Sequence, residues 1–111
     1  MIRLCAFSDE ASDSLEGQIA ALLRNNIKLT ELRSVGGVNV KDFTNEQAEA
    51  YAKQLAESGI RVWAIGSPLG KTDISKDFAE YEKTVRRVCE IANIFGCDKI
   101  RIFSFYNAYC Q

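Results

Sequence analysis

A chain of 111 residues has the length of one domain, and a composition of 47% hydrophobic and 26% charged residues is that of an ordinary globular protein. Its 14 basic and 15 acidic residues are well mixed and give a net charge of -1, which argues against nucleic acid as a partner. No apolar stretch approaches the ~20 residues that span a bilayer, and the first residues lack a signal-peptide layout. We therefore predict a cytoplasmic protein with no membrane partner.

Four short, largely apolar segments predict β-strands, at residues 2–7, 29–33, 61–65 and 99–105. Between them lie three segments with apolar residues at helical spacing. The first helix presents Leu15, Ile19, Leu22 and Leu23, the second Ala48, Tyr51, Ala52 and Leu55, and the third Phe78, Tyr81, Val85, Val88, Cys89, Ala92 and Phe95.

The ends of the helices also have recognisable signals. Asp13 with Glu16 predicts a capping box for the first helix, and Thr44 with Gln47 predicts one for the second. The three helix exits, at residues 26–28, 59–61 and 96–99, resemble one another, each with a left-handed cap, an apolar residue and a basic residue. The glycine-bearing segment at residues 34–37 is expected to be a loop.

The resulting order βαβαβαβ predicts an α/β fold with a parallel sheet and right-handed crossovers. Such a sheet needs cover on its faces, and its functional residues are expected at the carboxyl ends of the strands.

The absence of histidine removes the commonest general base and the commonest zinc ligand. Serine–histidine and cysteine–histidine catalysis are thereby excluded within this chain. Four cysteines, at positions 5, 89, 97 and 110, form no C-x-x-C pair and are expected to be reduced, mostly structural thiols. Cys5, in the middle of a predicted strand, is expected to be a small core residue.

Four motifs stand after the four strands: Ser8-Asp9-Glu10, Glu31-Leu32-Arg33, Ser67-Pro68-Leu69-Gly70-Lys71 and Phe103-Ser104-Phe105-Tyr106. In this order they resemble the xylose isomerase-like TIM-barrel family of sugar phosphate isomerases and epimerases, over residues 2 to 106. The resemblance implies a (β/α)₈ barrel that isomerises or epimerises a sugar or sugar phosphate with a divalent metal, Mn²⁺, Mg²⁺ or Zn²⁺.

A complete barrel of this kind needs about 250 residues, so the chain corresponds to the N-terminal half, with a half-barrel at 1–106 and a non-matching tail at 107–111. The family's metal ligands come mainly from the four later strands. The resemblance therefore assigns no catalytic and no metal-binding residue to this chain, and we expect no metal bound to it and no activity from it alone.

Five residues are candidates for substrate binding: Glu31, Arg33, Ser67, Lys71 and Tyr106. Glu31 and Arg33 share one face of a strand, where they either bind substrate oxygens or form an ion pair with neighbouring strands. Lys71 lies on a glycine-bearing loop that either meets an anionic ligand or is a plain turn. Asp9 and Glu10 face opposite sides of an extended chain, and capping or solvation is expected for them.

Three functions compete. The chain is the substrate-binding half of an isomerase or epimerase, or it is a non-catalytic half-barrel that self-associates through its two open edges, or it is a small binding module with an open flavodoxin-like sheet. The module is disfavoured because the acidic loop at residues 8–13 has no glycine and the wrong charge for phosphate. Open edge strands and exposed apolar faces predict a homodimer or higher oligomer.

Overall fold

The computed structural model describes residues 2–71 and 77–104, which form a four-stranded parallel sheet in the order β1-β2-β5-β6. The strands are β1 (Cys5–Ala6), β2 (Leu29–Leu32), β5 (Arg61–Gly66) and β6 (Ile100–Arg101). They are connected by the helices α1 (Leu15–Arg24), α2 (Asn45–Glu57) and α3 (Phe78–Ile94). The predicted parallel α/β architecture is confirmed, although the outer strands β1 and β6 pair over only two residues each.

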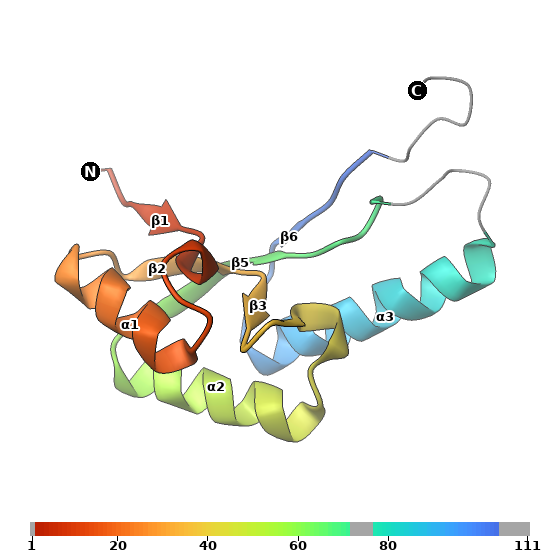
Figure 1. Ribbon diagram of the computed structural model, residues 1–111. Coiled ribbons are helices and arrows are strands. Elements are labelled where there is room, and N and C mark those ends of the chain that lie inside the picture. The colour runs from red at the N-terminus through yellow and green to blue at the C-terminus, as the bar shows by residue number, and fades with distance from the viewer. Residues whose placement is uncertain (1, 72–76, 105–111) are drawn as a thin grey trace.

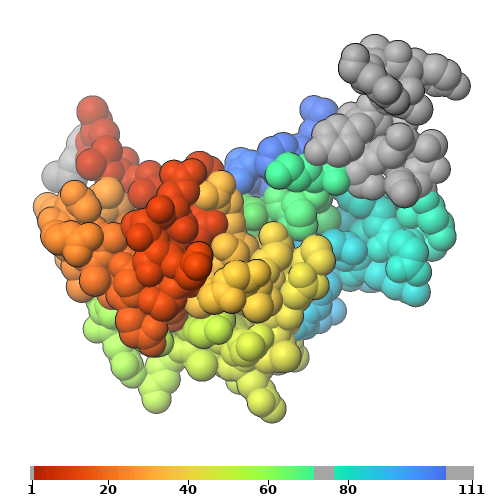
Figure 2. All heavy atoms as spheres, viewed as in Figure 1, coloured from red at the N-terminus to blue at the C-terminus, as the bar shows by residue number. Residues whose placement is uncertain are grey.

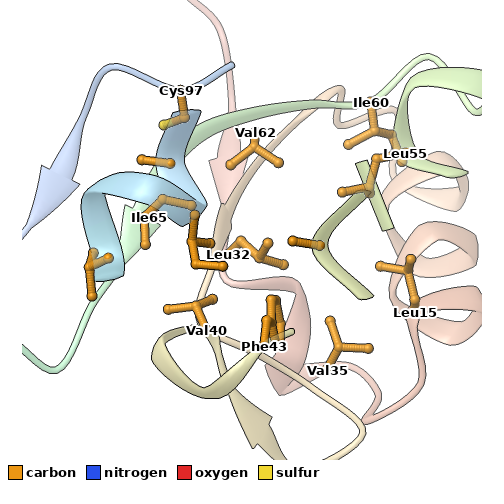
Figure 3. Close-up of a cluster of buried hydrophobic side chains, with 14 of the residues drawn as sticks. Leu15, Leu32, Val35, Val40, Phe43, Leu55, Ile60, Val62, Ile65 and Cys97 are labelled. Carbon is orange, nitrogen blue, oxygen red and sulfur yellow. The ribbon is translucent and has the colours of Figure 1, made fainter. Parts of the chain in front are cut away.

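All three helices lie on the same side of the sheet (Figure 1). The hydrophobic core fills the layer between them, where Leu32, Val62 and Ile65 from the sheet meet Leu15 and Leu55 from the helices (Figure 3). Phe43, only 2% exposed, closes this layer and makes an edge-on contact with Tyr51 at 5.3 Å between ring centroids. The face of the sheet that contacts the helices is therefore buried, whereas the opposite face has no helix covering it.

The helix termini follow the sequence signals in most places. α2 has the predicted capping box, in which the Gln47 backbone N–H donates to Thr44 Oγ1 at 3.0 Å and the Thr44 N–H donates to Gln47 Oε1 at 3.1 Å. The prediction for α1 is wrong by one residue, because Ser14 accepts the hydrogen bond from the Gly17 N–H, and its extended backbone allows it to cap.

The three helix exits share a left-handed residue, as expected. The φ angles are 55° at Asn26, 75° at Gly59 and 66° at Gly96. After each of these residues the chain enters the next strand within four residues, which explains why short connections return every helix to a parallel strand.

Residues 34–37 are not a plain loop, which corrects the sequence prediction. Ser34–Val35 (β3) and Val38–Asn39 (β4) form an antiparallel hairpin around Gly36 and Gly37. Both glycines have positive φ, 61° and 77°, as a tight two-residue hairpin turn requires. A one-turn 3₁₀ helix, η2 (Val40–Asp42), follows and buries Val40 in the core.

The helix-free face of the sheet is polar and aromatic. A Cβ built on Gly66 would lie close to Glu31, Arg33 and Arg101, so these three side chains share that face. A register shift where β2 pairs with β5 places Thr30 opposite Val62 and Glu31 opposite Ala64, so Trp63 is the extra residue of a bulge. Arg3 and Lys99 stack on the Trp63 ring at 4.9 and 4.0 Å.

The two edges of the sheet carry exposed apolar side chains. Next to β1, Ile2 is 89% and Leu4 61% exposed, and beyond β6, Ile102 is 62% exposed. In Figure 2 the segment before β1 and the segment after β6 both project from the helical layer. Among the described residues, no helix is long and apolar enough to cross a membrane.

Several positions that were expected to be buried are exposed. Cys5 and Cys89 are exposed, whereas Cys97 is buried, and all three are free thiols. Cys5 lies on an edge strand whose outer side has no neighbour, and Cys89 is one position away from the stripe that α3 buries through Val88, Ile91 and Ala92. Phe78, at the start of α3, is likewise 68% exposed.

Candidate functional site

Side chains from four segments converge where the strands end. The 3₁₀ turn η1 (Ser8–Glu10) follows β1 and places Asp9 against Arg33, just after β2. Arg33 Nε donates to both oxygens of Asp9 at 3.0 and 3.1 Å, and Nη2 donates to Oδ1 at 2.8 Å. These hydrogen bonds from the guanidinium to Asp9 raise the pKa of Arg33, so the arginine is cationic at every physiological pH.

A buried polar network fixes the η1 turn that carries Asp9. Ser8 Oγ donates to Gln18 Oε1 at 2.9 Å and lies 2.8 Å from Thr30 Oγ1. Gln18 in turn donates to the Ser34 carbonyl at 3.0 Å. Ser8, Gln18 and Thr30 are each at most 4% exposed, and a buried, fully satisfied network of this kind holds its members in one geometry.

The turn also answers the question of Asp9 and Glu10. Expected to diverge, they both approach Arg33 Nη2, at 2.8 and 3.4 Å, because the chain bends into η1 instead of staying extended. Asp9 is 15% exposed and ion-paired, which corrects the expected solvated or capping role. The Glu10 side chain is 71% exposed and is largely solvated, as expected.

A second ion pair crosses the sheet. Arg101 Nε on β6 donates to Glu31 Oε2 on β2 at 2.5 Å, passing over Gly66 of the strand between them. A Cβ at position 66 would lie 2.5 Å from Arg33 Cγ and 2.9 Å from Glu31 Oε2. The glycine therefore provides the space in which both ion pairs lie on the sheet.

Aromatic rings support the three cations. The Arg33 guanidinium lies 4.2 Å from the centroid of the Phe7 ring, and Arg101 lies 5.1 Å from Phe7 and 4.8 Å from Phe103. Lys71 Nζ lies 5.1 Å from the Phe103 ring. Cation–π contacts of this length stabilise the charged side chains and hold them in place at the carboxyl ends of the strands.

The loop after β5 is attached to the segment after β6. The Phe103 N–H donates to the Leu69 carbonyl at 2.7 Å, and the two segments lie side by side in Figure 2. Gly70 has a φ of 83° and passes so close that a Cβ there would meet the Phe103 carbonyl oxygen at 1.7 Å. Only glycine allows both the positive φ and this close approach to Phe103. Gly70 therefore determines the path of the backbone into Lys71.

Ser67 belongs to this attachment. It is 1% exposed, its Oγ donates to the Arg101 carbonyl at 2.6 Å, and it accepts from the Leu69 N–H at 3.3 Å. Its hydroxyl therefore connects strand and loop, and substrate binding by Ser67 stays a prediction that its position does not favour.

These elements line a cavity of about 100 Å³ that is open to solvent on one side. Its polar and aromatic lining comprises Arg33, Asn39, Ser67, Lys71, Arg101 and Phe103. Three of these residues are cationic, and no carboxylate lines the cavity among the described residues. The cavity is thus suited to a small anionic or hydrogen-bond-accepting group.

The structure brings together four residues that were expected at the site. At the carboxyl ends of the strands lie Glu31, Arg33, Ser67 and Lys71. Both Glu31 and Arg33 form ion pairs with neighbouring segments, as the structural alternative predicted. Tyr106 lies outside the described residues. Sequence reasoning missed Arg101 and Asn39, whereas Phe103 belongs to the motif noted after the fourth strand; the alternation of basic Arg101 and aromatic Phe103 along one strand face was the available signal for Arg101.

The carboxylates at the carboxyl ends of the strands do not suit a divalent metal. Both oxygens of Asp9 accept hydrogen bonds from Arg33, and Glu31 is bound by Arg101, so a cation already stands where the metal would be. Within residues 2–71 and 77–104, no group of three potential ligands among Cys, Asp and Glu is close enough to hold a metal ion.

Comparison with known proteins gave no match to a family model, and neither the curated proteins nor the solved structures contained a significant match.

Proposed function

We propose that the chain is the substrate-binding, N-terminal half of a (β/α)₈-barrel isomerase or epimerase of sugars or sugar phosphates. The observation that carries this proposal is the cavity at the carboxyl ends of the strands, where Arg33, Lys71 and Arg101 converge from three different segments. Ligand sites of parallel α/β folds lie at this end of the sheet.

The sheet topology supports the half-barrel part of the proposal. Strands follow one another in chain order, β1-β2-β5-β6, with every helix on the same face, as in successive βα units of a barrel. The helix-free face, which would line the barrel interior, carries charged and aromatic side chains such as Glu31, Arg101 and Trp63. Edges β1 and β6 would each take a further parallel strand.

The chemistry assigned to this half is binding and orientation. The three cations would bind ligand oxygens, Phe103 and Phe7 would shield them from water on one side, and Gly66 would leave the ligand access to the sheet. The family's divalent metal would find no suitable set of donors within residues 2–71 and 77–104, so no step is assigned to it in this half. Proton or hydride movement is assigned to residues of the other half.

The proposal is tested by an NMR titration of the 111-residue protein with a panel of pentoses, hexoses and their phosphate esters. We expect at least one compound to cause saturable shifts of the amide signals of Gly66, Lys71 and Phe103, without turnover. Absence of binding across the panel, or shifts confined to the helices, would contradict the proposal, as would isomerase activity of the chain by itself.

Self-association is a second candidate, favoured by the exposed apolar residues at both edges of the sheet, Ile2, Leu4 and Ile102. A second copy would cover these side chains if its β1 paired with β6 of the first, and a two-fold arrangement would form both junctions at once. Sedimentation velocity at micromolar concentration is expected to give a dimer or higher oligomer; a monomer would contradict this candidate.

A further inference from the structure

We infer that the cavity between Arg33, Lys71 and Arg101 binds a phosphate group, and that the ligand of this protein is therefore phosphorylated. This inference deepens the proposed function and rests on it for the identity of the rest of the ligand. Phosphate is distinguished here from the hydroxyl groups of a neutral sugar by charge, donor geometry and size.

Charge is the first argument. Three cations and the Asn39 amide surround the cavity, and the nearby carboxylates Asp9 and Glu31 do not line it. A phosphate monoester carries about -1.5 to -2 charges near pH 7 and three acceptor oxygens. Asp9 and Glu31 neutralise much of the charge of Arg33 and Arg101, whereas Lys71 has no ion pair within residues 2–71 and 77–104. The cavity therefore keeps a positive charge that neutral hydroxyl groups would not compensate.

Donor geometry is the second argument. Asp9 occupies the Nε edge of Arg33, and Glu31 occupies the Nε of Arg101. Within residues 2–71 and 77–104, no hydrogen bond engages Nη1 of Arg33 or either Nη of Arg101, and both side chains line the cavity. The carboxylates are thus positioning residues: they fix the arginines while other N–H groups remain available to phosphate oxygens.

Size is the third argument. At about 100 Å³ the cavity is well below the roughly 300–1,000 Å³ of pockets that enclose a complete small molecule. It therefore accommodates one group of the ligand, and the remainder would extend over the helix-free face of the sheet. Lys71, an exposed residue that lines the cavity at the end of a largely buried loop, supplies a cation that can approach the group from the solvent side.

The test is isothermal titration calorimetry of the full chain with four probes: inorganic phosphate, D-ribose 5-phosphate, D-ribose and sodium chloride as the ionic control. We expect the two phosphates to bind and ribose to bind at least about tenfold more weakly, since charge-assisted hydrogen bonds contribute most of the affinity. Affinity should increase from pH 5 to pH 7.5 as the phosphate, with its second pKa near 6, becomes a dianion.

Variants separate this cavity from general surface charge. Arg101→Gln is expected to weaken phosphate binding about tenfold or more, while Lys99→Gln changes it less than about twofold. The control removes the same charge two residues away, from a side chain that stacks on Trp63 and does not line the cavity. Lys71→Gln, at an exposed position, should weaken binding without affecting the fold, which guards against an unfolded Arg101 variant.

The outcomes are distinguishable. Equal affinity for ribose and ribose 5-phosphate would overturn the phosphate inference and leave the sugar-binding proposal intact. Equal affinity for inorganic phosphate and ribose 5-phosphate would support the inference and count against the sugar. Equal losses in the Arg101 and Lys99 variants, or no phosphate binding, would overturn the inference.

Discussion

Replacing Gly66 by alanine perturbs the centre of the proposed site with a single methyl group. The new Cβ would lie 2.5 Å from Arg33 Cγ, 2.9 Å from Glu31 Oε2 and 3.3 Å from an Nη atom of Arg101. Gly66 does not have a positive φ, so alanine meets no backbone strain there. The change therefore reports on the space beneath the two ion pairs.

Two effects oppose each other in this variant. Alanine restricts the unfolded chain and stabilises the fold by about 0.4–1 kcal/mol, whereas overpacking of a filled site costs about 1–3 kcal/mol. The Arg33 contact is made by Cγ, near the backbone, so this side chain can move away only by leaving its hydrogen bonds to Asp9. We therefore expect a net loss of about 1–2 kcal/mol in the free energy of unfolding.

Thermal unfolding followed by circular dichroism measures this loss. In a domain of this size each kcal/mol corresponds to about 4–8 °C in Tm. Phosphate affinity, measured in parallel, should also decrease because Arg33 and Arg101 are displaced from the cavity. A variant as stable as the parent, with unchanged phosphate affinity, would refute the role assigned to Gly66.

Three further changes test other parts of the structure. Thr44→Ala removes the capping box of α2 and should lower the free energy of unfolding by about 1 kcal/mol in urea denaturation; an unchanged midpoint would contradict the cap. Although Cys5 is exposed as a residue, partial desolvation of its thiol and, secondarily, Glu31 raise the pKa of that thiol, so iodoacetamide should alkylate it more slowly at pH 8 than in the urea-unfolded chain, and Glu31→Gln should increase the rate. If the edges self-associate, Ile102→Asp or Leu4→Asp should shift the protein towards monomer in sedimentation velocity without changing its far-UV circular dichroism at 20 °C, because both side chains are largely exposed in the single chain.

Much of the fold was predictable because it depends on local signals. A few neighbouring residues are enough to identify the capping box at Thr44 and the left-handed exits at Asn26, Gly59 and Gly96. The helices between these signals are identified by apolar residues at helical spacing. The hairpin was missed because its strands have two residues each, too few for an alternating pattern. Its Gly36-Gly37 turn was nevertheless a recognised hairpin signal.

The site was less predictable because its contacts join distant segments. Arg101 reaches Glu31 across 70 positions of sequence, and its identity as a strand residue gave no indication of that partner. Asp9 was expected to be solvated because the bend at η1 depends on the buried contacts of Ser8, which sequence reasoning did not include. Residue types indicated the correct end of the sheet, while tertiary structure determined which charges are paired and which line the cavity.

The side-chain Nη–Hη signals of the arginines, recorded at low temperature, test the central claim most directly. In ¹⁵N-labelled protein titrated with ribose 5-phosphate, we predict saturable shifts for Arg33 and Arg101, which line the cavity, and none for the exposed Arg61 at the start of β5. Equal shifts for all three arginines, or no shift for Arg33 and Arg101 at saturating ligand, would contradict a phosphate site at the carboxyl ends of the strands.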